Sequence, residues 1–496
     1  GGLRVPVGLL DQPLLQRRDP LWVDLAGGAG HMVVVGGPGS GRSTLLRTLV
    51  CGLALCHTPA EVQVYGLDFG GGALVGLRAL PHVGGVATRL DVSQVRRTVA
   101  ELTQLLVHRE RVFAAAGVDS MATYRRLRAA GHVPDDPFGD VILVIDGWAT
   151  VRADFEDLQD PLAELGNRGL SYGIHLVAAA TRWMDLRPSI RDVFGTRLEL
   201  RLGEPGDSAL DRRTAMNVPD AMPGRGITVD RLHFLAALPR IDAQRDATSV
   251  AAGAQDLAGR IAQAWDGHRA PPVRLLPTSV ALADLPAEAP DGGIPIGIAE
   301  TDLGPVTIDF DSHPHFLVYG DGGSGKTAFL RALARSIMGR YSPGEARLMV
   351  IDTRRTLLGV VDPDYLLGYG TSAAVTRAMI GEVVEVMRER LPPPDVTADQ
   401  LRTRDWWRGP TLYLLVDDYD LVATGGQPSP LLPLVEFFGQ AADIGLRVVL
   451  TRRTGGAART AYEPVLLGLR ELSPPGLLLS GSRDEGPLLG GLRPAE

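Results

Sequence analysis

The same succession of segments occurs twice in this chain of 496 residues, once from Val5 and once from Ile294. Each copy begins with a short apolar segment and continues with a strand-like segment that ends in an aspartate, Asp24 in the first copy and Asp309 in the second. A third apolar segment then leads into a glycine-rich turn and a helical pattern. This internal similarity constrains the fold more than any other feature, because two copies of one pattern predict two domains of one architecture.

Both copies continue in step. An apolar segment ending in aspartate follows each helical pattern, "VQVYGLD" to Asp68 and "ARLMVID" to Asp352. Further on stand "VILVID" and "LYLLVDD", and after them "IHLVAAATR" and "LRVVLTR". Continuous β-branched runs of this kind, separated by helical patterns, are typical of parallel strands in a sheet covered on both faces. The sequence therefore predicts the α/β class, as two tandem doubly wound parallel-sheet domains.

A break between the two copies is expected because a chain of this length is too long for one hydrophobic core. The last helical pattern of the first copy closes at Trp265, and the following stretch is rich in Pro, Ala and Gly, which interrupt regular elements. We predict a first domain at residues 1–265, a linker at residues 266–293 and a second domain at residues 294–496.

The glycine-rich turn of the second copy matches the full phosphate-binding pattern G-x-x-x-x-G-K-[ST]. Its eight residues are Gly320, Asp321, Gly322, Gly323, Ser324, Gly325, Lys326 and Thr327. Glycines let backbone N–H groups point at phosphates at the positive end of the following helix. Lys326 is placed to reach the terminal phosphates, and Thr327 offers its hydroxyl to Mg²⁺. The pattern stands between an apolar strand and a helix, so it predicts a P-loop NTPase site for ATP and Mg²⁺.

The turn of the first copy departs from that pattern at one position. Its residues are Gly36, Gly37, Pro38, Gly39, Ser40, Gly41, Arg42 and Ser43. Arg42 carries the charge that phosphates require, but its planar guanidinium is wider than the lysine ammonium. Pro38 also lacks a backbone donor. We predict nucleotide binding with altered geometry, and the alternative is a vestigial loop that only connects a strand to a helix.

The acidic strand ends bear on hydrolysis. Asp146 and Asp417 stand where an aspartate organises the water shell of the metal, together with the hydroxyls of Ser43 and Thr327. In hydrolysing proteins of this architecture a glutamate follows and orients the attacking water. Here the next residue is Gly147 or Asp418. Gly147 has no acid–base group, so we expect the first site to be inactive mainly there. Asp418 is one methylene short, and its alternative interpretation is a solvated carboxylate beyond the strand end.

Four long stretches carry a resemblance to known proteins: "GLDFGGGAL", "GIHLVAAATRW", "IRDVFGTRLELRLGEPGDS" and "NVPDAMPGRGITVDRLHFLAALPRID". Over nearly its whole length the chain resembles the FtsK/SpoIIIE-type motor ATPases with FtsK/RecA-like domains, and more closely the EccC-type ATPases of bacterial type VII (ESX) secretion systems. Those proteins have a membrane anchor followed by three ATPase domains, and this chain is similar to the second and third. It begins "GGLRVPVG" without methionine, so we expect a part of a longer protein.

The resemblance implies a division of labour. The first ATPase domain of such proteins hydrolyses ATP in a ring, whereas the second and third bind nucleotide with little or no turnover. The third recognises the C-terminal signal of an exported WXG-type protein. The expected partners are that substrate, other secretion components and the missing membrane-anchored part, in a multimer on the cytoplasmic side of the bacterial cell membrane.

Two further roles rest on the resemblance. A neighbouring chain's arginine completes the site in such motors, and Arg109 is the nearest match in position, the alternative being an ordinary exposed helix arginine. Thr181-Arg182 and Thr451-Arg452 end strands near the expected nucleotide edge, where a residue can sense the γ-phosphate.

Two rival functions remain open. A DNA translocase is expected to carry a basic patch or tail, but the formal net charge is −8 and no Lys/Arg cluster is present, so DNA is not an expected partner. A non-catalytic nucleotide-binding scaffold differs from the preferred function only in whether ATP ever turns over.

The two cysteines, Cys51 and Cys56, lie five residues apart on a predicted helix and face different directions. A disulfide between them is therefore not expected, which suits a reducing cytosol.

Overall fold

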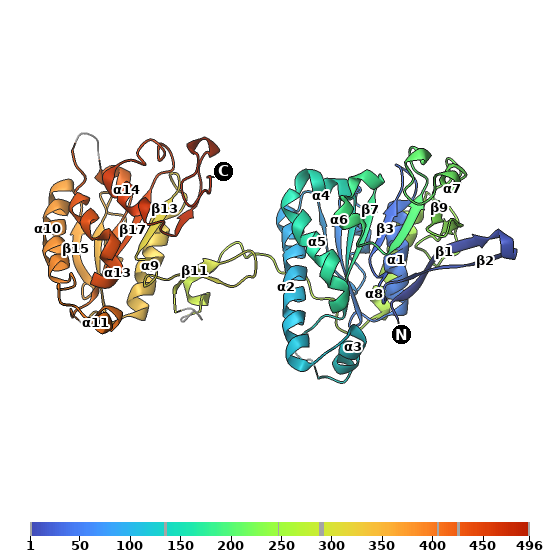
Figure 1. Cartoon of the computed structure of the whole chain (residues 1–496), viewed down its shortest axis with the longest axis horizontal. Helices are drawn as coiled ribbons and strands as arrows, with labels where there is room; N and C mark the ends of the chain where they lie inside the picture. The colour runs from blue at the N-terminus through green and yellow to red at the C-terminus, as the bar shows by residue number, and fades with distance from the viewer. Residues whose placement is uncertain are drawn as a thin grey trace. The chain divides into compact units, whose positions relative to one another are not determined.

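A computed structural model describes residues 2–132, 136–246, 248–286, 292–403, 406–423 and 427–494. The chain divides into two compact units (Figure 1). The first unit comprises Gly1–Leu276 with Glu300–Asp302, and the second comprises Pro277–Ala299 with Leu303–Glu496. Part of the stretch that the sequence predicts as a linker therefore groups with the first unit, and the domain limits 1–265 and 294–496 stay a prediction.

The first unit is built on one ten-stranded sheet with the order β2-β1-β10-β9-β8-β3-β7-β6-β4-β5. The bounds of its strands are β1 (Arg4–Gln12), β2 (Arg17–Asp24), β3 (Met32–Val35), β4 (Val62–Asp68), β5 (Val83–Thr88), β6 (Asp140–Asp146), β7 (Ile174–Ala180), β8 (Thr196–Leu200), β9 (Arg225–Thr228) and β10 (His233–Ala236). The six strands from β8 to β5 are parallel, as their uninterrupted apolar sequences predict. The other four extend the sheet in antiparallel fashion beyond β8.

The second unit contains a six-stranded parallel sheet with the order β15-β14-β16-β17-β13-β18 and a separate antiparallel pair, β11 and β12. Its strands are β11 (Ile294–Ile298), β12 (Pro305–Ile308), β13 (His315–Tyr319), β14 (Ala346–Ile351), β15 (Leu366–Gly370), β16 (Thr411–Val416), β17 (Leu446–Arg452) and β18 (Gly476–Leu478). This order repeats β5-β4-β6-β7-β3-β8 of the first unit strand for strand. The predicted duplication and the α/β fold class are confirmed.

Helices cover both faces of each parallel sheet. In the first unit they are α1 (Arg42–Cys56), α2 (Val92–Ala116), α3 (Met121–Ala129), α4 (Trp148–Asp154), α5 (Gln159–Arg168), α6 (Pro188–Arg191), α7 (Arg212–Met216) and α8 (Val250–Ala264). In the second they are α9 (Lys326–Arg340), α10 (Ala373–Glu389), α11 (Ala398–Thr403), α12 (Tyr419–Val422), α13 (Ala441–Ile444) and α14 (Pro464–Glu471), besides the 3₁₀ segment η8 (Leu432–Gln440).

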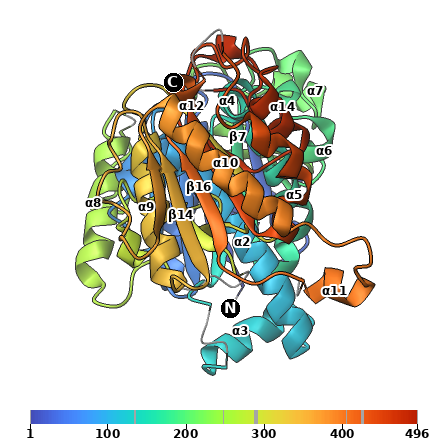
Figure 2. The same cartoon turned by 90° about the vertical axis from the view of Figure 1, so that its left-hand side faces the viewer.

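The core of each unit splits into two clusters, one on each face of its sheet. In the first unit α1 and α8 pack on one face, and α2, α4 and α5 pack on the other. In the second unit α9 packs on one face and α10 on the other, and Figure 2 shows α10 lying across the strands β14 and β16. Burial on both faces explains why these strands are apolar throughout.

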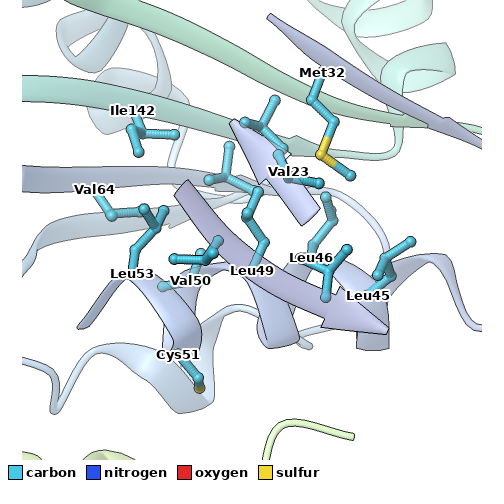
Figure 3. Packing of buried hydrophobic residues seen from close by; sticks show 14 of the residues in the cluster. Val23, Met32, Leu45, Leu46, Leu49, Val50, Cys51, Leu53, Val64 and Ile142 are labelled. Atoms are coloured by element: carbon cyan, nitrogen blue, oxygen red, sulfur yellow. The ribbon is translucent and has the colours of Figure 1, made fainter. Parts of the chain in front are cut away.

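Helix α1 follows the first glycine-rich loop and is held by its apolar side. Leu45, Leu46, Leu49 and Leu53 recur at helical spacing and are at most 1% exposed. Figure 3 shows Leu46 and Leu49 pointing from α1 toward the strands of the sheet. This packing fixes the N-terminus of α1 at the carboxyl end of β3, next to the loop predicted to bind phosphate.

Within the described ranges, no helix combines the length and the apolar character that a membrane span requires. Cys51 is buried and Cys56 is exposed on α1, and both are free thiols.

Candidate nucleotide-binding sites

The first loop joins β3 to α1, and its backbone depends on glycine. Gly39 and Gly41 have φ of 71° and 102°, in the left-handed region that L side chains rarely adopt. The carbonyl of Ser40 accepts a hydrogen bond from the N–H of Gly224 at 2.8 Å. A Cβ on Gly41 would also lie 3.0 Å from that same nitrogen. The loop is therefore held against a segment almost two hundred positions later in the chain.

A cavity of about 640 Å³ opens beside this loop. Residues 39–44 line one side of it, and the other side comes from residues 223–224 and 235–238, at the ends of β9 and β10, with Arg245 and the start of α8. The antiparallel extension of the sheet thus provides a wall of the first site. Residues 223–224 and 235–238 were not predicted to line this site, although they lie in the stretch "NVPDAMPGRGITVDRLHFLAALPRID".

Arg42, which stands where the phosphate-binding pattern has lysine, lies inside this site. Its Nη1 donates to the carbonyl of Gly36 in the same loop. Burial lowers the pKa of Arg42 from its usual value, and the Asp146 carboxylate opposes that change. An arginine remains charged in proteins, so the guanidinium is a cation held within the loop by a weak partner that a phosphate can replace.

Asp146 ends β6 next to the loop. Its side chain is buried, and its Oδ2 has no hydrogen-bond partner within the part of the chain that the structure describes. Burial raises the pKa of Asp146, and a hydrogen bond with Ser43 opposes the rise. A buried carboxylate with a free oxygen beside a hydroxyl is a donor set of the kind that Mg²⁺ prefers. The residues present therefore fit a nucleotide-bound Mg²⁺.

Gly147 follows Asp146 and has φ 96°. A Cβ at this position would lie 3.2 Å from two atoms of Phe69. Any side chain here therefore costs backbone strain as well as space, and a glutamate cannot be introduced at Gly147 without distortion.

The second loop joins β13 to α9 and holds its lysine in a similar way. Lys326 Nζ donates to the carbonyls of Gly320 and Asp321 at 2.9 and 3.0 Å. It also lies 3.6 Å from Oδ1 of Asp418. The side chain is buried within its own loop, so a phosphate that bound Lys326 would have to replace these contacts.

Hydroxyl groups surround Asp417. Thr327 Oγ1 donates to Oδ2 at 2.6 Å, and Thr451 Oγ1 donates to Oδ1 at 2.7 Å. Thr356 Oγ1 lies 3.3 Å from Oδ2. The predicted metal pair, Thr327 and Asp417, is thus already in contact, and its oxygens fit Mg²⁺ as the first site does. A cavity of about 240 Å³ lies over residues 322–328.

Asp418 is not a solvated carboxylate, and that alternative interpretation is wrong. The residue is 6% exposed and adopts φ 44°. Its two carboxylate oxygens face two cations, Lys326 and Arg354, the latter at 3.3 Å from Oδ2. Burial and the neighbouring Asp417 raise the pKa of Asp418.

The interpretation of Arg109 as an arginine offered to a neighbouring chain is also wrong for this structure, as is the alternative of an exposed helix arginine. Its side chain is 0% exposed and pairs with Asp136 at 2.7 Å. The remaining donors reach the carbonyls of Tyr172, Phe138 and Gly139 at 2.6 to 2.8 Å. All of these partners belong to the first unit, so Arg109 joins α2 to the segments that lead into β6 and β7.

The two Thr-Arg pairs lie beside the loops, as predicted for strand ends at this edge. Thr451 contacts Asp417, as described above. Thr181 and Arg182 line a cavity of about 370 Å³ together with Gly37 and Pro38. Their role in sensing the γ-phosphate stays a prediction.

The chain is similar to proteins of known family. A model of the FtsK/SpoIIIE family matches residues 6–243 and 294–406. The ESX secretion system protein EccC of Thermomonospora curvata is 52% identical over 495 residues, which are 100% of this chain and 38% of that protein. The ESX-4 secretion system protein EccC4 of Mycobacterium tuberculosis is 45% identical, over 99% of this chain and 39% of that protein. The chain thus spans less than two fifths of the length of these relatives.

Another relative is covered more fully. The ESX-1 secretion system protein EccCb1 of Mycolicibacterium smegmatis is 38% identical over 98% of this chain and 84% of its own length. Among solved structures, the Thermomonospora curvata EccC (ATPases 2 and 3) in complex with a signal sequence peptide matches with a TM-score of 0.93 and 52% identity, over 100% of this chain and 89% of that one. The chain therefore belongs to the FtsK/SpoIIIE family, within the group of EccC proteins of ESX secretion systems.

Proposed function

We propose that this chain is the part of a type VII (ESX) secretion ATPase that binds ATP with Mg²⁺, turns it over little or not at all, and recognises the C-terminal signal of an exported WXG-type protein. One observation carries the nucleotide half of the proposal. Each loop presents a cation and a hydroxyl beside a strand-end aspartate, yet the position after that aspartate holds Gly147 or Asp418. Such a site can hold phosphates, but it lacks the glutamate that positions water.

Specific residues would hold the nucleotide. Loop N–H groups and Lys326 in the second site, or Arg42 in the first, would bind the phosphates. Thr327 with Asp417, and Ser43 with Asp146, would hold the Mg²⁺, which neutralises phosphate charge when bound. The whole protein would act as a multimer at the cytoplasmic side of the membrane, with a membrane-anchored part and other secretion components as partners.

The first site gives a direct test of low turnover. In protein whose second site is silenced by Lys326→Ala, changing Arg42 to Lys should leave ATP hydrolysis at background. The reason is that hydrolysis depends on positioning, and nothing at Gly147 can orient water. Phosphate release in steady state is the measurement, with the Lys326→Ala protein as the matched control. Robust hydrolysis in the double variant would show that Arg42, and not Gly147, is the block.

The proposed peptide site is inferred from a segment of the first unit. Residues 269–274 lie along β5 and α2 of that unit. The N–H of Ala270 donates to Pro81 at 2.8 Å, and Tyr65 donates to the carbonyl of Pro271 at 2.6 Å. The backbone N–H and the side chain of Arg274 both reach Glu101. A segment outside the sheet thus packs against β5 and α2 in the first unit.

Corresponding positions in the second unit are exposed and apolar. Leu67 and Ile351 are equivalent residues of the two units. Leu67 pairs with Ala87 and Ile351 pairs with Gly370, so Ala87 and Gly370 are equivalent as well. Three residues before them stand Gly84, which touches the segment, and its counterpart Leu367. Asp91 and Ser372 are the N-caps of the equivalent helices α2 and α10. Gln94 and Val375 each follow their cap by three residues and are therefore equivalent. Leu367 and Val375 are 53% and 44% exposed.

We propose that the signal peptide binds the exposed apolar surface formed by Leu367 on β15 and Val375 on α10. An amphipathic helix that lays its apolar side on exposed leucine and valine is a common mode of recognition. The related Thermomonospora curvata structure contains a signal sequence peptide, which supports a peptide as the occupant.

Fluorescence anisotropy with a labelled C-terminal peptide of a WXG-type protein tests this placement on the whole chain. Leu367→Glu or Val375→Glu should weaken binding by about tenfold or more, because each loses apolar burial and adds a charge. Leu467→Glu, at an exposed leucine on α14, is the matched control and should change little. Unchanged affinity in the first two variants, or tight binding of duplex DNA at moderate salt with none of the peptide, would contradict the proposal.

A further inference from the structure

Asp418 and Arg354 form a pair inside the second site that the general chemistry of a phosphate-binding loop does not require. Arg354 Nε lies 3.3 Å from Asp418 Oδ2, while Lys326 Nζ lies 3.6 Å from Oδ1 of the same carboxylate. All three side chains line the cavity over the loop. One buried carboxylate thus holds two cations in the space where phosphate charge is expected.

The position of Arg354 is fixed by the strand end before it. Asp352 follows β14, and its Oδ1 accepts the backbone N–H of Arg354 at 3.0 Å. Its Oδ2 accepts the N–H of Leu357 at 2.7 Å and the hydroxyl of Tyr369 at 2.6 Å. The backbone of Arg354 is therefore anchored, while its side chain is 49% exposed and can turn toward a ligand.

The first unit lacks both members of the pair. Counting from the equivalent aspartates Asp68 and Asp352, the position of Arg354 is taken by Gly70. A Cβ on Gly70 would lie 2.5 Å from Oδ2 of Asp146, so any side chain there would displace the Asp146 carboxylate. The position of Asp418 is taken by Gly147. Arginine and aspartate are thus present together in one unit and absent together in the other, as expected of two residues that serve one purpose.

We propose that Arg354 is a specificity-determining residue that makes the second site select nucleoside triphosphate over diphosphate. In the structure the Asp418 carboxylate holds both Arg354 and Lys326. The γ-phosphate of a triphosphate would displace this carboxylate from Lys326, and Arg354 would thereby be released to bind the γ-phosphate. A diphosphate has no γ-phosphate, so it leaves Arg354 paired with Asp418. The inference rests on the proposed function, because it requires that the second loop binds nucleotide.

The same geometry predicts opposite effects for the two partners. Loss of Arg354 removes a charge-assisted contact to the γ-phosphate, so it should weaken triphosphate binding and spare diphosphate, which has no γ-phosphate. Neutralising Asp418 removes the competing anion, so it should strengthen triphosphate binding. Arg355 is the matched control, since it is the next residue, is exposed and does not line the cavity.

Isothermal titration of the whole chain with Mg²⁺ and either ADP or the non-hydrolysable ATP analogue AMP-PNP tests the inference. The background carries Arg42→Glu, so that the first loop repels phosphate. Arg354→Ala should weaken AMP-PNP binding by about tenfold to a hundredfold and ADP binding by less than about threefold. Arg355→Ala should change neither affinity, Asp418→Asn should strengthen AMP-PNP binding severalfold, and Arg354→Lys should fall between Arg354→Ala and the parent.

Two outcomes overturn the inference, and they are distinguishable. Equal weakening of both nucleotides by Arg354→Ala, or no weakening of either, would refute the selective role of Arg354 while still agreeing with a nucleotide site at the second loop. Absence of binding by either nucleotide in the Arg42→Glu parent would refute the second nucleotide site itself. Thermal unfolding of each variant shows that it is folded, which is expected because the Arg354 side chain is half exposed.

Discussion

Replacement of Arg109 by methionine is expected to lower the free energy of unfolding of the first unit by about 3–5 kcal/mol, because Asp136 is left as an unpaired buried charge. Both side chains are at most 1% exposed and meet at 2.7 Å. Three backbone carbonyls lose their donors as well. Hydrogen exchange of β6 and β7 peptides in denaturant, measured on the whole chain, reports the change in this unit alone.

The matched control is Arg111→Met, at an exposed arginine of the same helix, which should change stability by less than about 0.5 kcal/mol. Combining Arg109→Met with Asp136→Asn should recover part of the loss, since the buried charge is then removed. A single Arg109→Met variant as stable as the parent would show that the buried pair does not hold α2 to the sheet.

Changing Lys326 to alanine is expected to abolish the stabilisation of the second unit by ATP. A ligand that binds only the folded state raises stability by about 2.7 kcal/mol at a hundredfold excess over Kd. The parent protein should therefore show slowed exchange in β13 and α9 when ATP and Mg²⁺ are added, and the variant should show none. Hydrogen exchange with and without nucleotide is the measurement, so any effect of the substitution on the nucleotide-free protein cancels.

Lys326→Arg is the matched control, because it gives the second loop the cation that the first loop has at Arg42. It should retain part of the ATP effect, since an arginine still offers charge and donors to phosphate. An undiminished ATP effect in Lys326→Ala would mean that this loop is not the nucleotide site of the second unit.

Local sequence signals determined much of this protein. Uninterrupted apolar strands, helical periodicity and glycine-rich turns are properties of short segments, so the parallel sheets and both loops could be predicted from them. The duplication added the topology, because equivalent segments take equivalent places, and β5-β4-β6-β7-β3-β8 recurs as β15-β14-β16-β17-β13-β18. Strand-end acids such as Asp146 and Asp417 were predictable because the carboxyl ends of parallel strands share one edge.

Only the tertiary structure decided the environments of single side chains. Arg109 is polar and lies on a helix, and nothing local to it shows that Asp136 and the carbonyls around Gly139 close over it. The pairing of Asp418 with Arg354 and the wall that β9 and β10 add to the first cavity also join residues far apart in the chain. Burial and charge pairing depend on which distant segments meet, and a segment read by itself does not contain that information.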